Sequence, residues 1–198
     1  YEHADDISAE AAYRNLWVGD DGCYMCPLAC LHRGSIRSGR FSGMVHDGPE
    51  YEGIMMSANI GIHNLPDWSA AIAMADDMGL CYISMGNVLG FVMEAMEKGD
   101  ISASQLDGVN LKWGDIDGVL ELQKKTALGE GCGKLLGQNL RAMVAAWGGK
   151  TEDYAIETKG QGWAAWNSRA LPKFETTYLT ANRGGDHLTG ADIATQNT

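Results

Sequence analysis

The sequence predicts a mainly α-helical fold followed by a loop-rich segment after residue 150. Between residues 66 and 147, apolar residues recur at the spacing of helix faces, and the helical segments stop at glycines. The chain is 45% hydrophobic and 21% charged, the balance of a globular protein rather than a disordered one. After residue 150 the sequence is rich in Trp, Gly, Thr and Asn and has no clear period, which is typical of loops around a binding site.

The first elements are short. Residues 6–17 have helical composition, with Ala11, Ala12 and Leu16 on one stripe. Residues 33–49 are rich in Gly, Ser and Arg, which indicates a loop or a short hairpin. A longer helix is expected to begin at a cap formed by residues 67–69 and to end at Gly79.

Three further helices complete the first part of the chain. They are expected over residues 87–98, 115–128 and 134–147, each followed by glycine. Residues 151–198 would begin a second unit made of loops and short elements. The sequence therefore predicts two domains, 1–150 and 151–198, of which the second is only a start.

The charge excludes some classes of function. The chain has 15 basic and 26 acidic residues, a net charge of −11, and no basic stripe, so nucleic acid is not expected as a partner. Apolar runs fall short of the roughly 20 residues that span a bilayer. The chain shows no signal-peptide pattern and no initiator Met. We expect a segment of a longer cytoplasmic protein.

Three of the five cysteines lie within eight residues. Cys23, Cys26 and Cys30 form a C-x2-C-x3-C pattern, which can wrap thiolates around one metal centre. A secreted disulfide framework would spread an even number of cysteines along the chain. The pattern favours a 4Fe-4S cluster that needs a fourth thiolate from elsewhere.

Two other interpretations of this cluster stay open on the pattern alone. A zinc site needs a fourth Cys or His, and His32 is only two residues beyond Cys30. Three buried, reduced thiols without a metal are the second alternative. The residues that follow the cysteines in the chain are needed to distinguish these interpretations.

An ordered series of motifs follows the cysteines. It comprises the segments G-P-E-Y-E-G at 48–53, S-A-N-I-G-I at 57–62, D-D-M-G-L-C at 76–81, W-G-D at 113–115, K-G at 159–160 and N-R-G-G-D-H-L at 182–188. In order and approximate spacing, over about residues 20–190, this series resembles the aldehyde:ferredoxin oxidoreductase family. Each motif alone is weak evidence for this resemblance, whereas the ordered set is specific for the family.

The resemblance implies a set of cofactors and a reaction. Family members hold tungsten, or sometimes molybdenum, between two pterin dithiolenes, with a 4Fe-4S cluster close by. They oxidise aldehydes to carboxylic acids and pass the electrons to ferredoxin or to a small iron–sulfur subunit. The resemblance implies that residues 1–150 bind the cluster and pterin, and an oligomer is expected.

The resemblance also implies roles for individual residues. The D-x-x-G-L motif, which contacts a pterin in the family, corresponds to Asp76, Gly79 and Leu80. The acid/base groups correspond to Glu50 or Glu52, with no choice between them, and to His187, with Arg183 beside it. Such groups suit the attack of an oxygen nucleophile on an aldehyde carbonyl, which needs a general base. His46 is a weaker candidate near this site, and Asp77 is expected at the surface.

This chain departs from the family pattern at Cys81, the fourth of its five cysteines. Cys81 stands where the first D-x-x-G-L motif of the family usually has Asp. We expect Cys81 beside the pterin and the fourth cluster thiolate beyond residue 198, with Cys81 as the less favoured fourth ligand. Cys132 is expected to be a structural thiol.

A second departure concerns the substrate. Where the family has a Glu and a Y-D-P-R run after the K-G motif, this chain has Gly162 and the residues 166–169, of which only Arg169 is kept. Trp163 and Trp166 stand there instead and would favour an aromatic substrate. Two alternatives therefore stay open: the active-site subunit of a tungsten-dependent benzoyl-CoA reductase, acting on an aromatic acyl substrate, and a non-catalytic iron–sulfur electron-transfer subunit.

Overall fold

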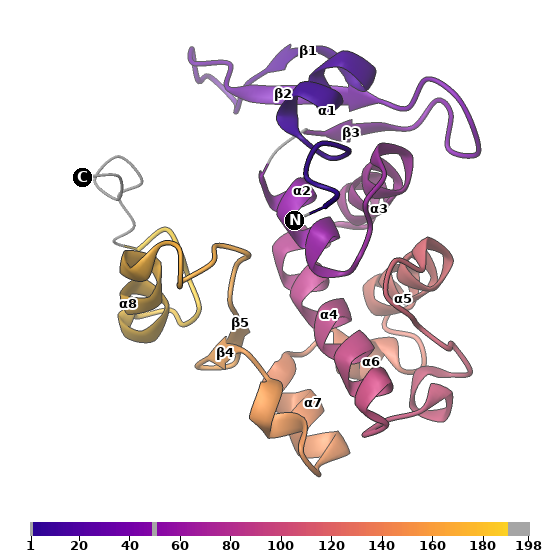
Figure 1. Cartoon of the computed structure of the whole chain (residues 1–198), viewed down its shortest axis with the longest axis vertical. Helices are drawn as coiled ribbons and strands as arrows, with labels where there is room; N and C mark the ends of the chain where they lie inside the picture. Colours follow the sequence, from indigo (N-terminus) through magenta and orange to yellow (C-terminus); the bar gives the residue numbers. More distant parts are fainter. Residues whose placement is uncertain (1, 49–50, 190–198) are drawn as a thin grey trace.

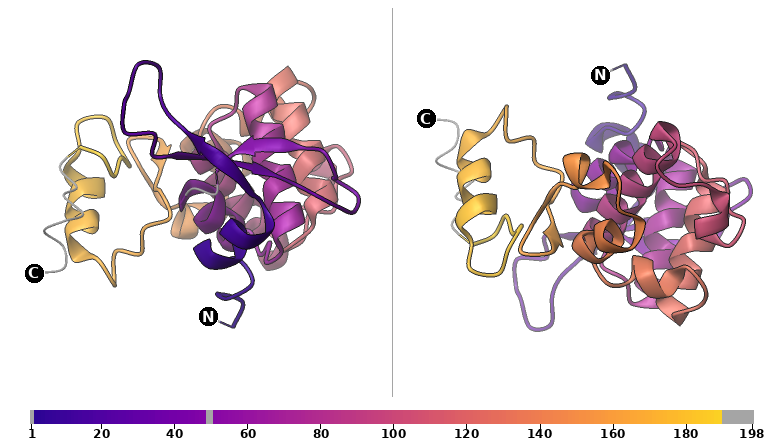
Figure 2. Two further views of the ribbon diagram at one scale, coloured as in Figure 1. Left: turned by 90° about the horizontal axis from the view of Figure 1, so that it is seen from above. Right: turned by 90° about the horizontal axis from the view of Figure 1, so that it is seen from below.

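The computed structural model describes residues 2–48 and 51–189 and has the predicted mainly α-helical architecture (Figure 1). A three-stranded sheet lies at one end of the molecule, next to α2 and α3 (Figure 1). Helix α4 runs through the middle, and a small hairpin with α8 lies to one side of it (Figures 1 and 2).

The N-terminal part forms a short helix and an antiparallel sheet. Helix α1 (Ala9–Asn15) begins at Ser8, whose hydroxyl accepts the amide N–H of Ala11. The strands β1 (Trp17–Asp21), β2 (Leu31–Ser35) and β3 (Val45–Asp47) pair in that order. Residues 33–49, expected to form a loop or a short hairpin, lie in the hairpin of β2 and β3. The predicted helix over 6–17 is too long, because Trp17 already begins a strand.

Three helices follow the sheet. They are α2 (Tyr51–Asn59), α3 (Leu65–Met78) and α4 (Tyr82–Lys98). The cap of α3 is Asn64 rather than residues 67–69, since the Asn64 side chain accepts the N–H of Asp67. Gly79 ends α3 with a φ of 69°, as predicted, and its N–H donates to the carbonyls of Ala75 and Asp76.

Close packing of α2 against its neighbours depends on two glycines. A Cβ at Gly86 on α4 would lie 2.5 Å from the Cβ of Met56, and one at Gly53 would lie 2.2 Å from Ile72 Cδ1 on α3. Trp68 of α3 is fully buried in the core between these helices. The absence of side chains at both glycines therefore lets the three helices approach.

The remaining helices of the first part cover the other side of α3 and α4 (Figure 1). After the 3-10 turn η1 (Ala103–Leu106) come α5 (Ile116–Leu128), α6 (Gly133–Leu136) and α7 (Leu140–Trp147). The single helix predicted over 134–147 is wrong. The Asn139 side chain accepts the N–H of Ala142 and starts a new helix there.

The segment after residue 150 contains only short elements. They are η2 (Thr151–Tyr154), β4 (Glu157–Thr158), β5 (Gln161–Gly162) and α8 (Pro172–Thr180). Here Ala164, Phe174 and Tyr178 form a small buried cluster apart from the main core. The domain boundary at residue 150 stays a prediction.

Within the described residues, no single helix is long and apolar enough to cross a membrane. Helices α3 and α4 taken together would be long and apolar enough to cross one, but the chain bends by 119° at the break between them.

Candidate active site

The three clustered cysteines lie on the loop between β1 and β2, which projects from the sheet (Figure 1). Cys23 and Cys30 are exposed and Cys26 is half-buried, and the N–H of Cys26 donates to the carbonyl of Cys23. Met25 and Ala29, each directly before a cysteine, have φ values of 60° and 45°, so the backbone turns sharply at both positions. The loop therefore exposes thiols on a tightly curled backbone.

The donor chemistry of this loop suits an iron–sulfur cluster, but its thiols are not gathered. Among the residues that the structure describes, no three His, Cys, Asp or Glu side chains lie together as a metal site. Tyr24, Met25 and Leu28 on the same loop are 94%, 86% and 77% exposed, so apolar side chains surround the thiols without being packed themselves. The loop carries three cysteines of the type that ligate such a cluster, and the cluster assignment stays a prediction.

Several of the predicted site residues meet at a cavity of about 230 Å³ between β3, α2 and the α3–α4 turn. Glu52, Asp76, Leu80 and Cys81 all line it. Glu52 comes from the first turn of α2, whereas the others come from the end of α3 and the cap of α4. The fold thus brings together residues that were predicted from two separate motifs.

A second cavity of about 530 Å³ lies on the other side of the α3–α4 turn. Gly79, Leu80, Cys81 and Arg183 line it, so Leu80 and Cys81 form a wall common to both cavities. The Arg183 guanidinium lies 3.8 Å from the buried carboxylate of Asp186 and is itself largely exposed. It supplies a positive charge at the rim of this cavity.

Asp76 is held in an unusual environment for a carboxylate. Its pKa is raised chiefly by desolvation, and the nearby carboxylates of Asp47, Asp77 and Glu52 raise it further. The amide N–H of Asp47 donates to Asp76 at 3.3 Å and opposes this shift. The side chain is nevertheless solvent-accessible, so Asp76 is a hydrogen-bond acceptor at the edge of a cavity.

His187 is joined to α2 by a tyrosine that sequence reasoning missed. The Tyr51 hydroxyl lies 2.8 Å from His187 Nε2, and the two rings meet edge to face. Tyr51 also stacks on Trp166 with ring centroids 4.9 Å apart. Desolvation lowers the pKa of His187, although the charges of Asp186 and Glu52 oppose this, so the imidazole is neutral near pH 7. The only sequence signal for Tyr51 was its position inside the G-P-E-Y-E motif.

A third cavity, of about 510 Å³, lies between Asp76 and the start of the cysteine loop. Asp21 and Gly22 line it at one end, and Asp47 and Asp76 at the other. His46 also lines it and is buried, with Nδ1 3.0 Å from the Asp47 carbonyl. The third cavity shares Asp47 and Asp76 with the first, and the first shares Leu80 and Cys81 with the second. The three cavities therefore lie in a row from the start of the cysteine loop to Arg183.

The other predicted residues lie as follows. Glu50 lies outside the described residues, so Glu52 alone of the pair is described. Asp77 is at the surface, as expected. Cys132 is half-buried beside Asp107, and burial raises the pKa of its thiol to about 11. Arg169 is exposed and lines none of the cavities described above.

Comparison with known proteins identifies relatives of the whole chain. It is 31% identical over 190 residues to the tungsten-containing aldehyde ferredoxin oxidoreductase of Pyrococcus furiosus, covering 95% of this chain and 30% of that protein. It is 29% identical over 201 residues to the WOR-like subunit of an aliphatic sulfonate oxidoreductase from the same organism, covering 98% of this chain and 32% of that one. The chain thus spans about a third of the length of these relatives.

A solved structure shares the fold. The active-site complex BamBC of benzoyl-coenzyme A reductase, bound to 1,5-dienoyl-CoA, matches with a TM-score of 0.69 and 21% identity, over 88% of this chain and 26% of that one. The family model for aldehyde ferredoxin oxidoreductase, domains 2 and 3, matches residues 1–198. The chain therefore belongs to the aldehyde ferredoxin oxidoreductase family, which is a family of tungsten oxidoreductases.

Proposed function

We propose that this chain is part of a tungsten-pterin enzyme that oxidises an aldehyde to its carboxylic acid and passes the electrons through a 4Fe-4S cluster to ferredoxin or a small iron–sulfur subunit. The observation that carries this proposal is the meeting of Glu52, Asp76 and Cys81 at one cavity. Tyr51, whose hydroxyl is hydrogen-bonded to His187, directly precedes Glu52 in the chain.

The residues around these cavities fit a pterin cofactor. The Asp76 carboxylate would accept hydrogen bonds from the amino-pyrimidine edge, which carries donors. Arg183 would bind an anionic group of the cofactor in the second cavity. Leu80 and Cys81, between the two cavities, would line it on both sides. When bound, the cofactor would supply the oxygen-transfer and two-electron redox chemistry.

The protein's own groups would handle the protons. Oxidation of an aldehyde with water gives the acid, two electrons and two protons. Glu52 lines the cavity and would accept a proton as the oxygen nucleophile attacks the carbonyl. His187 is neutral near pH 7 and would hold a second proton, with Tyr51 fixing the orientation of its ring. Cys23, Cys26 and Cys30 would supply three of the four cluster thiolates.

The test uses the full-length protein loaded with tungsten, with benzaldehyde or acetaldehyde as substrate and a viologen dye as electron acceptor. Glu52→Gln should lower kcat by about 100-fold or more, the usual contribution of a general base. Glu10→Gln, on the exposed first turn of α1, is the matched control and should leave kcat unchanged. Inactivity toward every aldehyde despite full tungsten content would contradict the proposal.

The two alternatives give different results in the same preparation. Dearomatisation of benzoyl-CoA without aldehyde oxidation would indicate a reductase of the benzoyl-CoA type. Iron without tungsten or molybdenum in elemental analysis would indicate an electron-transfer subunit. Replacing Cys26 by Ser should lower the iron content in either case, because one cluster ligand is lost.

A further inference from the structure

The hairpin of β4 and β5 carries a lysine in an unfavourable backbone conformation. Thr158 pairs with Gln161, so Lys159 and Gly160 form a two-residue turn between the strands. Both turn residues have positive φ, 55° for Lys159 and 87° for Gly160. Turns of this kind favour Asn-Gly or Gly-Gly, because positive φ is sterically costly for most residues that have a Cβ. The preference of the turn therefore does not explain a lysine at this position.

The ammonium group of Lys159 makes contacts that do explain it. Its Nζ donates to the carbonyls of Ala181 at 3.0 Å and of Asn182 at 3.1 Å. Ala181 is the C-terminal cap of α8, where helix carbonyls lack partners and the helix dipole favours a positive charge. Helix α8 lies wholly within the described residues and has no basic residue in its own last turn. Lys159 therefore supplies this positive charge from the hairpin.

The chain that leaves α8 also packs directly on the hairpin, and two glycines allow this. A Cβ at Gly184 would lie 2.5 Å from the Thr158 carbonyl oxygen, and one at Gly185 would lie 2.6 Å from the Gln161 carbonyl oxygen. The N–H of Gly185 donates to the Thr158 carbonyl at 3.2 Å. Because no side chain separates the two backbones, the position of residues 181–185 is set by the hairpin.

The hairpin is itself anchored to two helices of the first part of the chain. The Asn87 side-chain amide on α4 donates to the Trp163 carbonyl, directly after β5, at 2.6 Å. Arg141 on α7 donates to both carboxylate oxygens of Glu157 on β4, at 2.8 and 3.1 Å. The hairpin is thus fixed to the helices, and the loop 181–187 is in turn held by the hairpin.

This loop carries two groups of the proposed site. Arg183 directly follows Asn182 and lines the second cavity together with residues 160–162 of the hairpin. His187 lies 2.8 Å from the Tyr51 hydroxyl. A movement of the loop away from the hairpin would therefore open the wall of the second cavity and displace both Arg183 and His187.

We propose that Lys159 is a positioning residue, which fixes Arg183 and His187 in the site by binding the carbonyls of Ala181 and Asn182. This inference rests on the proposed function for the roles of Arg183 and His187. It also makes a separate statement about the order of the loop 181–187, which can be measured without turnover.

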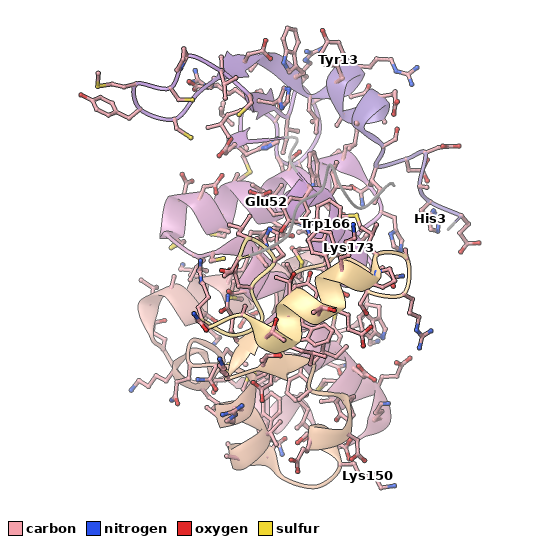
Figure 3. All side chains as sticks on the ribbon, turned by 90° about the vertical axis from the view of Figure 1, so that its left-hand side faces the viewer. His3, Tyr13, Glu52, Lys150, Trp166 and Lys173 are labelled. Atoms are coloured by element: carbon pink, nitrogen blue, oxygen red, sulfur yellow. The ribbon has the colours of Figure 1, made fainter. Side chains whose placement is uncertain are left out.

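The experiment compares three variants of the full-length protein. Lys159→Asn removes the ammonium group but suits the turn, so it separates the loss of the contact from damage to the hairpin. Lys159→Arg keeps a cation that can donate to both carbonyls. Lys150→Met is the matched control, because it removes an exposed lysine that Figure 3 shows far from Glu52.

Hydrogen exchange of the amides of residues 184–189 gives the first measurement. The exchange rate should rise about tenfold in Lys159→Asn, because the bonds from a charged donor are lost and the loop opens locally. In Lys159→Arg and in Lys150→Met it should stay within about threefold of the unaltered protein. Helices α3 and α4 should stay protected in all three variants.

Turnover of benzaldehyde gives the second measurement. Lys159→Asn should lower kcat about tenfold with KM nearly unchanged, because a displaced proton-carrying group slows the reaction step. In a protein that already carries His187→Gln, the same substitution should lower kcat less than about twofold, since Lys159 then has no imidazole to position. A general loss of folded protein would instead lower kcat equally in both backgrounds.

The outcomes separate this proposal from the proposed reaction. Unchanged hydrogen exchange in Lys159→Asn would overturn the proposal, as would a Lys159→Arg variant as impaired as Lys159→Asn. An equal loss of kcat with and without His187→Gln would also overturn it. Raised exchange, restored by arginine, in a protein that oxidises no aldehyde would support the Lys159 contact and refute the proposed reaction alone.

Discussion

At the scale of single residues, His46 shows how burial shifts the pKa of an imidazole near the proposed site. His46 is 3% exposed, and burial lowers the pKa of its imidazole. The Asp47 carbonyl and charge oppose this shift without cancelling it. The sequence predicted that His46 lies near the site, and it does line a cavity with Asp76. Its burial was not predictable, because it depends on Trp68 and Gly34, which come from other elements.

The lowered pKa of His46 predicts a loss of stability in mild acid. When the pH falls through about 6.5, the unfolded chain binds a proton at this histidine before the folded chain does. The folded state therefore loses stability until the pH passes below the folded pKa. The melting temperature should fall between pH 7.5 and 5.5, and His46→Phe should reduce this fall. A fall in melting temperature as large as that of the unaltered protein would contradict the role of His46. A smaller fall should remain, because the pKa of His187 is lowered as well.

Tyr51 gives a second prediction at this scale. Tyr51→Phe keeps the ring contact with Trp166 but removes the hydroxyl that lies 2.8 Å from His187. If this bond only orients the imidazole, kcat should fall about three- to tenfold, the range of one net hydrogen bond, with KM unchanged. Tyr13→Phe, on the exposed face of α1, is the control. A kcat equal to that of the unaltered protein would show that the bond has no positioning role.

At the scale of helices and strands, three helix ends marked by glycine were predicted correctly, whereas the beginnings of α3 and α4 were not. Gly79, Gly99 and Gly129 have positive φ and end their helices at the predicted residues. Beginnings depend on which of several polar side chains caps the first turn, so Asn64 replaced the predicted 67–69 cap. Helix α2 was missed because its buried face includes Gly53 and Ser57 rather than a stripe of large apolar residues.

The glycine contact between α2 and α4 can be tested by its effect on stability. Gly86→Ala would place a methyl group 2.5 Å from the Met56 Cβ, which cannot move without shifting the backbone. The overpacking should lower the free energy of unfolding by about 1–3 kcal/mol, more than the gain in helix propensity of ~1 kcal/mol. Gly19→Ala, whose Cβ would meet nothing within 4 Å, is the control. Chemical denaturation measures both, and equal stability would contradict the close approach.

At the scale of the whole molecule, the cavities depend on contacts between distant parts of the chain. The motifs identified Glu50 or Glu52 together with Asp76, Cys81, Arg183 and His187. Of these, Glu52, Asp76, Cys81 and Arg183 line cavities around the α3–α4 turn, and His187 contacts Tyr51 at the start of α2. Sequence spacing could not show this, because Arg183 and Cys81 are far apart in the chain. Nor could it show that the thiols of Cys23, Cys26 and Cys30 stay ungathered on their loop.

The small cluster of the segment after residue 163 should unfold separately from the main core. Phe174 is fully buried there between Trp166 and Tyr178. Phe174→Ala should cost about 3–5 kcal/mol, enough to open this part locally. Hydrogen exchange should then increase in residues 164–187, while α3 and α4 stay protected. Equal loss of protection in α3 and α4 would show that the two clusters unfold together.

The hydrogen bond between Tyr51 and His187 also imposes an order of assembly. Its partners are separated by 136 residues, and closing a loop of this length costs about 4 kcal/mol of chain entropy. Contacts within α2, α3 and α4 close much shorter loops and are favoured earlier in folding. The Tyr51–His187 hydrogen bond is thus completed only after the segment that carries His187 has returned to α2. Until then the second cavity lacks the wall that residues 160–162 and Arg183 contribute, so Leu80 and Cys81 stay open to solvent on that side.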